Sequence, residues 1–153
     1  MRIAVAALLL LLTCTRLSAA EREVVVGVYQ NAPKITAAAD GQPSGILGDL
    51  LSEIAIGQQW RLKPVQCDWA YCLQLLQAGE IDLLPDVAFT EQRALQLDFH
   101  QTPALYSWSQ LYTAPGVQLT SLAGLEGKRV LVLQDSVQQQ YLQKMITEAG
   151  IDA

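Results

Sequence analysis

The residues of this sequence best suited to chemistry are Cys67, Cys72 and the only histidine, His100. A zinc site would need further ligands at a suitable spacing, and no cysteine or histidine lies near His100 in the sequence. Four residues separate Cys67 from Cys72, whereas the thioredoxin-like redox motif has two between its cysteines. The spacing therefore favours a structural disulfide between Cys67 and Cys72 that closes a strand end onto a helix start, with no metal bound and no redox role.

Three further candidates follow predicted strands: Tyr29, Trp69 and Asp86. In open α/β sheets, ligands bind outside the carboxyl ends of the strands, so the loops after strands are the places to search. Asp86 can accept hydrogen bonds from a ligand amine, and Tyr29 or Trp69 can stack on an apolar or cationic ligand. Each also has a purely structural interpretation. Asp86 can be a turn aspartate, Trp69 can pack a helix against the core, and Tyr29 can be an aromatic residue at the end of a strand.

The elements that would position these residues alternate between short apolar strands and helical patterns, which is typical of a parallel sheet covered by helices. The predicted strands cover residues 24–28, 60–65 and 81–84, and the predicted helices cover residues 46–57, 69–78 and 91–95. Asp68 and Thr90 are the expected amino-terminal caps of the second and third helices. The fold class is therefore α/β.

The amino terminus has the layout of a secretory signal peptide. Arg2 precedes an apolar run over residues 3–12 that is too short to span a bilayer, and residues 18–20 are small. We expect cleavage after Ala20 and export to the periplasm. A retained anchor helix is one alternative, although it would need a longer apolar run. Lipidation at Cys14 is another, although a threonine precedes that cysteine and matches a lipobox poorly.

The expected mature part is acidic and comes from an oxidising compartment. Removing residues 1–20 lowers the number of basic residues from 10 to 8, against 15 acidic residues. This charge argues against a nucleic acid partner. After the leader, no apolar stretch approaches the ~18 residues that a membrane span requires. Export also supports the disulfide, because close cysteine pairs tend to bridge in oxidising compartments.

Seven short motifs follow one another along the expected mature chain. They are Val26-Gly27-Val28 with Ala32-Pro33, Gly41-Gln42-Pro43-Ser44-Gly45, Gly48-Asp49-Leu50, Gly79-Glu80-Ile81-Asp82, Thr90-Glu91-Gln92-Arg93, Leu97-Asp98-Phe99 and Leu125-Glu126-Gly127-Lys128-Arg129-Val130. In this order the motifs resemble bacterial extracellular solute-binding protein family 3, which includes amino-acid receptors. The resemblance implies a periplasmic-binding-protein type 2 fold: two α/β lobes joined by a crossover, which bind a small molecule in the cleft between them.

The resemblance also assigns a role to Arg93. In the amino-acid-binding relatives, the arginine of the Thr-x-x-Arg segment holds the ligand carboxylate through a paired hydrogen bond, a task that suits the planar guanidinium. A solvated helix arginine is the alternative. The preceding loop departs from the pattern, because residues 85–89 read Pro-Asp-Val-Ala-Phe where many relatives place hydroxyl side chains. This loop resembles the sensor branch of the family, whose members precede histidine kinases or diguanylate cyclases.

The same resemblance divides the chain into a first lobe over residues 21–105, a crossover over residues 106–114 and part of a second lobe over residues 115–153. Aromatic residues such as Tyr106 and Trp108 occupy the crossover, where they either line the cleft or pack the hinge, and packing is the safer expectation. The second lobe is expected to be truncated, because one strand and its helix cannot bury both faces of a sheet.

Two elements are predicted within that partial lobe. Lys128 to Leu133 has the pattern of a buried strand, and residues 137–149 have helical spacing. Ser136 precedes the helix and forms a capping-box pattern with Gln139. In relatives the corresponding turn touches the ligand from the second lobe. The alternative is that Ser136 is a cap and nothing more.

These observations predict extracytoplasmic binding of a small polar solute, an amino acid or a related metabolite, by a transport receptor that works with a membrane permease. The alternative is the ligand-sensing domain of a histidine kinase or diguanylate cyclase-type protein. A dehydratase-like enzyme on the same scaffold would need an acid or base in the cleft, and His100 lies in a segment better explained by packing. We therefore expect no enzymatic activity and no cofactor. Arg93 argues for an acid group in the ligand and Asp86 for an amine.

Overall fold

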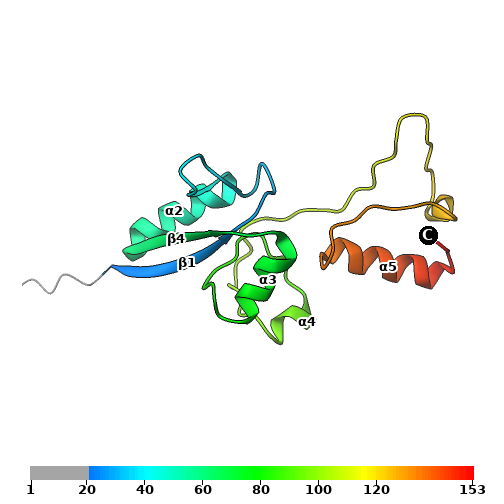
Figure 1. Cartoon of the computed structure of the whole chain (residues 1–153). Coiled ribbons are helices and arrows are strands. Elements are labelled where there is room, and N and C mark those ends of the chain that lie inside the picture. Colours follow the sequence, from blue (N-terminus) through cyan, green and yellow to red (C-terminus); the bar gives the residue numbers. More distant parts are fainter. Residues whose placement is uncertain (1–20) are drawn as a thin grey trace, which may run out of the picture.

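The computed structural model describes residues 21–153, so the predicted signal peptide lies outside the described residues. The regular elements are β1 (Arg22–Val28), β2 (Thr36–Ala37), β3 (Pro43–Ser44), α2 (Ile46–Gln58), β4 (Trp60–Gln66), α3 (Trp69–Gln77), α4 (Glu91–Ala94), the 3-10 helix η1 (Leu122–Leu125) and α5 (Val137–Ala149). Figure 1 shows that the strands and α2 to α4 gather in one body, which an extended segment joins to α5. The mixed helix and strand content confirms the α/β class.

The centre of this body is the parallel pair of β1 and β4, in which Val24 lies opposite Leu62 and Val26 opposite Pro64. Both strands match the predicted ranges within one or two residues. The prediction of a third strand over residues 81–84 is wrong, because Leu83 makes only an isolated parallel bridge to Val26. Pro85 has no N–H to donate to a ladder, and Asp86 adopts a positive φ of 62°, so the chain turns away from the sheet.

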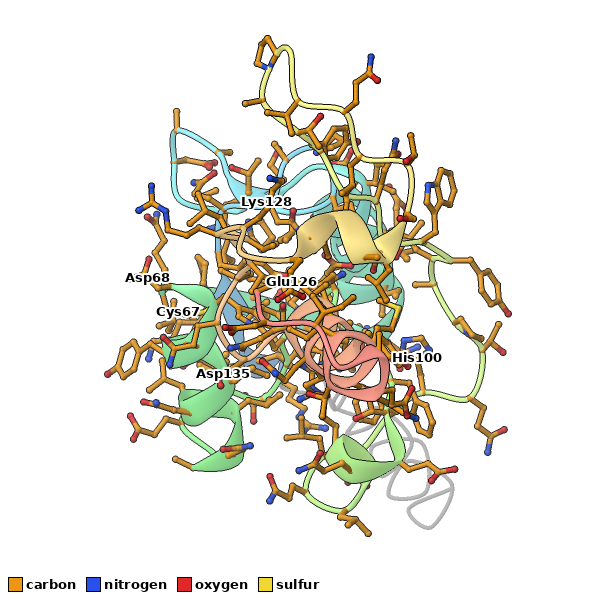
Figure 2. All side chains as sticks on the ribbon, turned by 90° about the vertical axis from the view of Figure 1, so that its right-hand side faces the viewer. Cys67, Asp68, His100, Glu126, Lys128 and Asp135 are labelled. Atoms are coloured by element: carbon orange, nitrogen blue, oxygen red, sulfur yellow. A yellow bond between two sulfur atoms is a disulfide. The ribbon has the colours of Figure 1, made fainter. Side chains whose placement is uncertain are left out.

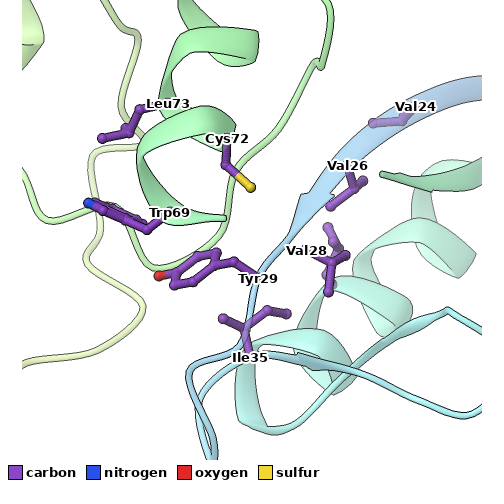
Figure 3. Close-up of a cluster of buried hydrophobic side chains, with 9 residues drawn as sticks. Val24, Val26, Val28, Tyr29, Ile35, Trp69, Cys72 and Leu73 are labelled. Atoms are coloured by element: carbon purple, nitrogen blue, oxygen red, sulfur yellow. The ribbon is translucent and has the colours of Figure 1, made fainter. Parts of the chain in front are cut away.

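Helices cover the two sides of the strand pair, and Figure 1 shows α2 and α3 on opposite sides of it. The β-branched residues of β1 alternate toward the core, where Val26 and Val28 are fully buried. Figure 3 shows these valines in one cluster with Ile35, Trp69 and Cys72. The core therefore joins the sheet to the first residues of α3, which is where the candidate ligand-binding residues begin.

The helix boundaries agree with the capping signals in the sequence, with one exception. The Thr90 side chain accepts a hydrogen bond from Arg93 N at 3.1 Å, and Gly79 follows α3 with φ 71°. Asp68 stands at the amino-terminal cap of α3, but its side chain makes no capping hydrogen bond. Within residues 21–153, every helix is too short or too polar to cross a membrane.

The part of the chain after residue 105 has less regular secondary structure and fewer buried side chains than the part before it. Residues 128–133 form no strand, which corrects that prediction, and the side chain of Leu131 is 98% exposed. In the described part of the chain, no strand lies beside residues 128–133 to form backbone hydrogen bonds with them. Tyr106 and Trp108 are also exposed, so the structure does not show the expected hinge packing. The predicted helix is present as α5, with Ile146 buried.

A disulfide joins Cys67 to Cys72, with their Cα atoms 5.4 Å apart, and so ties the end of β4 to the first turn of α3. Closing this short loop should stabilise the fold by about 2 kcal/mol, chiefly through the unfolded chain. We expect reduction of the wild-type chain to lower its free energy of unfolding in urea by that amount. A Cys67→Ala/Cys72→Ala variant should have this lower free energy of unfolding already without reductant, and adding reductant should not change it. An unchanged urea midpoint after reduction would contradict a stabilising role.

Candidate functional site

The three residues predicted to follow strands lie together around Tyr29, at the end of β1. The Tyr29 hydroxyl donates to Asp86 Oδ2 at 3.2 Å, and its ring lies against Trp69 with centroids 5.0 Å apart and planes tilted by 58°. Figure 3 shows that the Tyr29 oxygen and the Trp69 nitrogen both lie on the side of the cluster away from Val24 and Val26. The apolar parts of the two rings thus complete the core, and their polar ends face the loops.

Asp86 is the most heavily bonded side chain of this cluster. Besides Tyr29, its Oδ2 accepts from Asn31 Nδ2 at 2.6 Å and pairs with Lys34 Nζ at 2.5 Å. Burial and the Asp86 carboxylate raise the pKa of Tyr29, so the tyrosine hydroxyl remains a donor. Sequence reasoning missed both Asn31 and Lys34. Asn31 lies within the loop that follows the first strand, but nothing in the spacing links Lys34 to a residue as distant as Asp86.

Arg93 enters the cluster from α4. Its Cζ lies 5.7 Å from the centre of the Trp69 ring, within the range of a cation–π interaction. Nη1 donates to the Ala88 carbonyl at 2.9 Å, and Nη2 donates to the Asp135 carbonyl at 2.8 Å. Burial lowers the pKa of Arg93, while Tyr29 and Asp135 act in the opposite direction. Arg93 is therefore a half-buried cation that contacts both the body around β1 and the start of α5.

Ser136 is buried at the amino-terminal cap of α5, directly after the residue that Arg93 contacts. Its Oγ accepts from Gln139 N at 3.1 Å, and the Gln139 side chain accepts from Asp135 N at 2.8 Å. The predicted capping interaction of Ser136 is thus present. Asp135, which sequence reasoning did not select as a contact, has a positive φ of 59°. A ligand contact for Ser136 stays a prediction.

The Trp69 indole leaves one polar group without a partner. Trp69 is 8% exposed, and its Nε1 is buried with no hydrogen-bond partner among residues 21–153. Buried polar groups in proteins are nearly always hydrogen-bonded, so such a donor calls for an acceptor. Together the cluster contains a half-buried guanidinium, a buried indole N–H without a partner and two buried aromatic rings. This is a set of groups suited to a small, partly apolar acid.

The comparison with known families decides what kind of protein presents this cluster. The model described as "Bacterial extracellular solute-binding proteins, family 3" matches residues 24–145. The chain belongs to this family. No curated protein matches the chain. Membership of family 3 agrees with the motifs of the sequence and implies a location outside the cytoplasm.

Solved structures with the family 3 fold cover most of this chain. An ancestral arginine-binding protein bound to arginine has 25% identity and a TM-score of 0.63, covering 85% of this chain and 58% of its own. A histidine kinase sensor domain with similarity to periplasmic binding proteins has 21% identity and a TM-score of 0.63, covering 84% and 57%. A putative L-cystine ABC transporter from Listeria monocytogenes has 20% identity and a TM-score of 0.67, and the match covers 84% of this chain and 56% of that protein. This chain thus spans less than two thirds of each, which agrees with a first lobe and part of a second.

The remaining candidates of this family 3 chain make no polar contact with Tyr29, Asp86 or Arg93. Cys67 and Cys72 are occupied by their disulfide. His100 is exposed, its Nδ1 contacts the Thr102 carbonyl, and Figure 2 shows it well apart from Cys67 and Asp68. Among residues 21–153, no group of three histidine, cysteine, aspartate or glutamate side chains is arranged to hold a metal ion. A surface hollow on α5, lined by Gln143, Lys144 and Thr147, includes none of the cluster.

Proposed function

We propose that this protein binds a small polar acid, of the amino-acid or related metabolite class, between its two lobes in the periplasm. The observation that supports the proposal most is the position of Arg93, whose guanidinium lies over Trp69 and reaches Asp135 beside the cap of α5. A cation that is half-buried between an aromatic face and a helix start is well placed to receive a carboxylate.

The contacts of Arg93 suggest how an acid would be held. The Ala88 and Asp135 carbonyls that accept from the guanidinium are neutral, whereas a carboxylate carries a full negative charge and can accept two parallel N–H bonds from the planar fork. An entering carboxylate would therefore displace or share these acceptors. The rings of Tyr29 and Trp69 would pack against the apolar part of the ligand, and the first turn of α5 would supply amides from the second lobe. Closure of the lobes would bury all of these groups.

We infer that the bound solute is passed to a membrane permease, as in transport receptors. A sensory role is the second candidate, and the Pro85-Asp86-Val87-Ala88 sequence favours it because this loop resembles the sensor branch of the family. Deleting the gene separates the two. Loss of uptake of the radiolabelled ligand indicates transport, whereas normal uptake with an altered kinase or cyclase response to the ligand indicates sensing.

Ligand binding is tested by thermal-shift and calorimetric titration of the full-length protein. The panel consists of amino acids, carboxylic acids without an amine, and amines without a carboxylate. We expect at least one acid to stabilise the protein, by about 2.7 kcal/mol when its concentration is about 100 times the Kd. Amines without a carboxylate should cause no shift. A protein that bound only such amines, or no acid at all, would contradict the proposal.

A further inference from the structure

The carboxylate of Asp86 is already paired by the protein itself. Its Oδ2 receives the Tyr29 hydroxyl, the Asn31 amide and the Lys34 ammonium. The Lys34 and Asp86 side chains are 31% and 15% exposed, so this ion pair is partly shielded from solvent. Because solvent screens it less, such an ion pair is more stable than a fully exposed one. Asp86 therefore lacks the free negative charge that an incoming ammonium group would need.

The other charges around the cluster point the same way. Arg93 is a cation, and the carboxylate of Asp135, an exposed residue of the second lobe, acts on it and raises its pKa. With Lys34 and Asp86 cancelling each other, these two side chains and Arg93 together carry the single positive charge of Arg93. A ligand ammonium placed beside Asp86 would also lie close to the Lys34 ammonium, and close like charges oppose binding.

The unpartnered donor of Trp69 adds a second, independent observation. Its buried Nε1–H needs an acceptor, and an ammonium group is only a donor. If ligand entry opens the site at Trp69, a hydroxyl, keto or carboxylate oxygen would satisfy this N–H, whereas an ammonium group would not. The cluster thus matches an acid with a second oxygen better than it matches an acid with an amine.

We propose that Lys34 makes this site select small acids that lack a cationic amine, such as hydroxy acids, over the corresponding amino acids. This inference rests on the proposed function, because it assumes that Arg93 holds the carboxylate. Lys34 acts as a specificity-determining residue: it neutralises Asp86, which would otherwise accept the ammonium group of an amino acid.

The test is calorimetric titration of the full-length polypeptide with matched pairs of probes: phenylalanine with phenyllactate, leucine with hydroxyisocaproate and glutamate with hydroxyglutarate. We expect the hydroxy acid of at least one pair to bind about tenfold more tightly than its amino acid, a difference of about 1.4 kcal/mol. Lys34→Met should reduce or reverse that ratio by about tenfold, because it frees the Asp86 carboxylate. Lys34→Arg, which keeps the charge, should retain the preference.

Lys63→Met is the matched control, because Lys63 lies on β4, is exposed and pairs with Glu23, 3.4 Å away and outside the cluster. It should leave the preference unchanged, and circular dichroism should show all variants folded. A wild-type protein that prefers the amino acid of every pair it binds overturns the Lys34 inference and leaves the proposed function standing. If Lys34→Met leaves the ratio of hydroxy-acid to amino-acid affinity unchanged, the Lys34 inference is likewise overturned and the proposed function stands. Binding of none of these or other acids overturns both proposals.

Discussion

Replacing Arg93 with alanine is expected to weaken binding of an acid ligand by at least about a hundredfold. Hydrogen bonds to charged groups contribute about 1.5–3 kcal/mol each, and the guanidinium fork can make two with one carboxylate. Losing both corresponds to roughly two to four orders of magnitude in Kd. The measurement is calorimetric titration of the full-length polypeptide with the tightest-binding acid of the panel.

Two further arginine variants make this result specific. Arg93→Lys keeps the positive charge but loses the planar fork, so its affinity should fall between those of the wild type and Arg93→Ala. Arg61→Ala removes an exposed arginine of β4 that pairs with Glu23, and it should leave binding unchanged. The free energy of unfolding of unliganded Arg93→Ala should fall by no more than about 1–3 kcal/mol, the net contribution of two hydrogen bonds to carbonyls. Unchanged affinity together with a larger loss of stability would identify Arg93 as structural.

Replacing Gly45 with alanine is expected to lower the free energy of unfolding by about 2 kcal/mol or more. Gly45 has φ 87°, and a Cβ at this position would lie 2.6 Å from the Pro33 carbonyl oxygen and 3.0 Å from that of Lys34. Both oxygens are also hydrogen-bonded to the first turn of α2, at 3.1 Å from Ile46 N and 2.9 Å from Leu47 N. The added methyl group would therefore push the loop that carries Lys34 away from the helix. Urea unfolding measures the loss.

Gly57→Ala is the matched control for this substitution. Gly57 lies within α2, and a Cβ at this position would meet no atom within 4 Å. Since alanine favours a helix over glycine by about 0.8–1.0 kcal/mol, this variant should be as stable as the wild type or more stable. Equal effects of the two substitutions would show that the close approach of Gly45 to the Pro33–Lys34 backbone does not constrain the fold.

The amino-acid sequence is enough to predict the features that depend on near neighbours in the chain. The β-branched run of β1, the helical spacing of α2 and α5, and the caps Thr90 and Ser136 are local patterns, and the structure confirms them. The disulfide belongs to the same class, because its cysteines are only five positions apart. The family motifs also lie within short segments. The boundaries of the lobes and crossover at residues 105 and 114 stay a prediction.

Which of these segments contact one another could be learned only from the folded chain. The predicted strand over residues 128–133 is absent because no other strand of the described part of the chain lies alongside it. The one over residues 81–84 is reduced to a bridge between Leu83 and Val26, because the chain turns away from the sheet at Pro85 and Asp86. Sequence reasoning placed Tyr29, Trp69 and Asp86 near one edge of the sheet, but it could not show that Lys34 pairs with Asp86 or that Arg93 reaches Asp135. Both contacts join residues distant in the chain, and their energies depend on distance and burial, which only the fold sets.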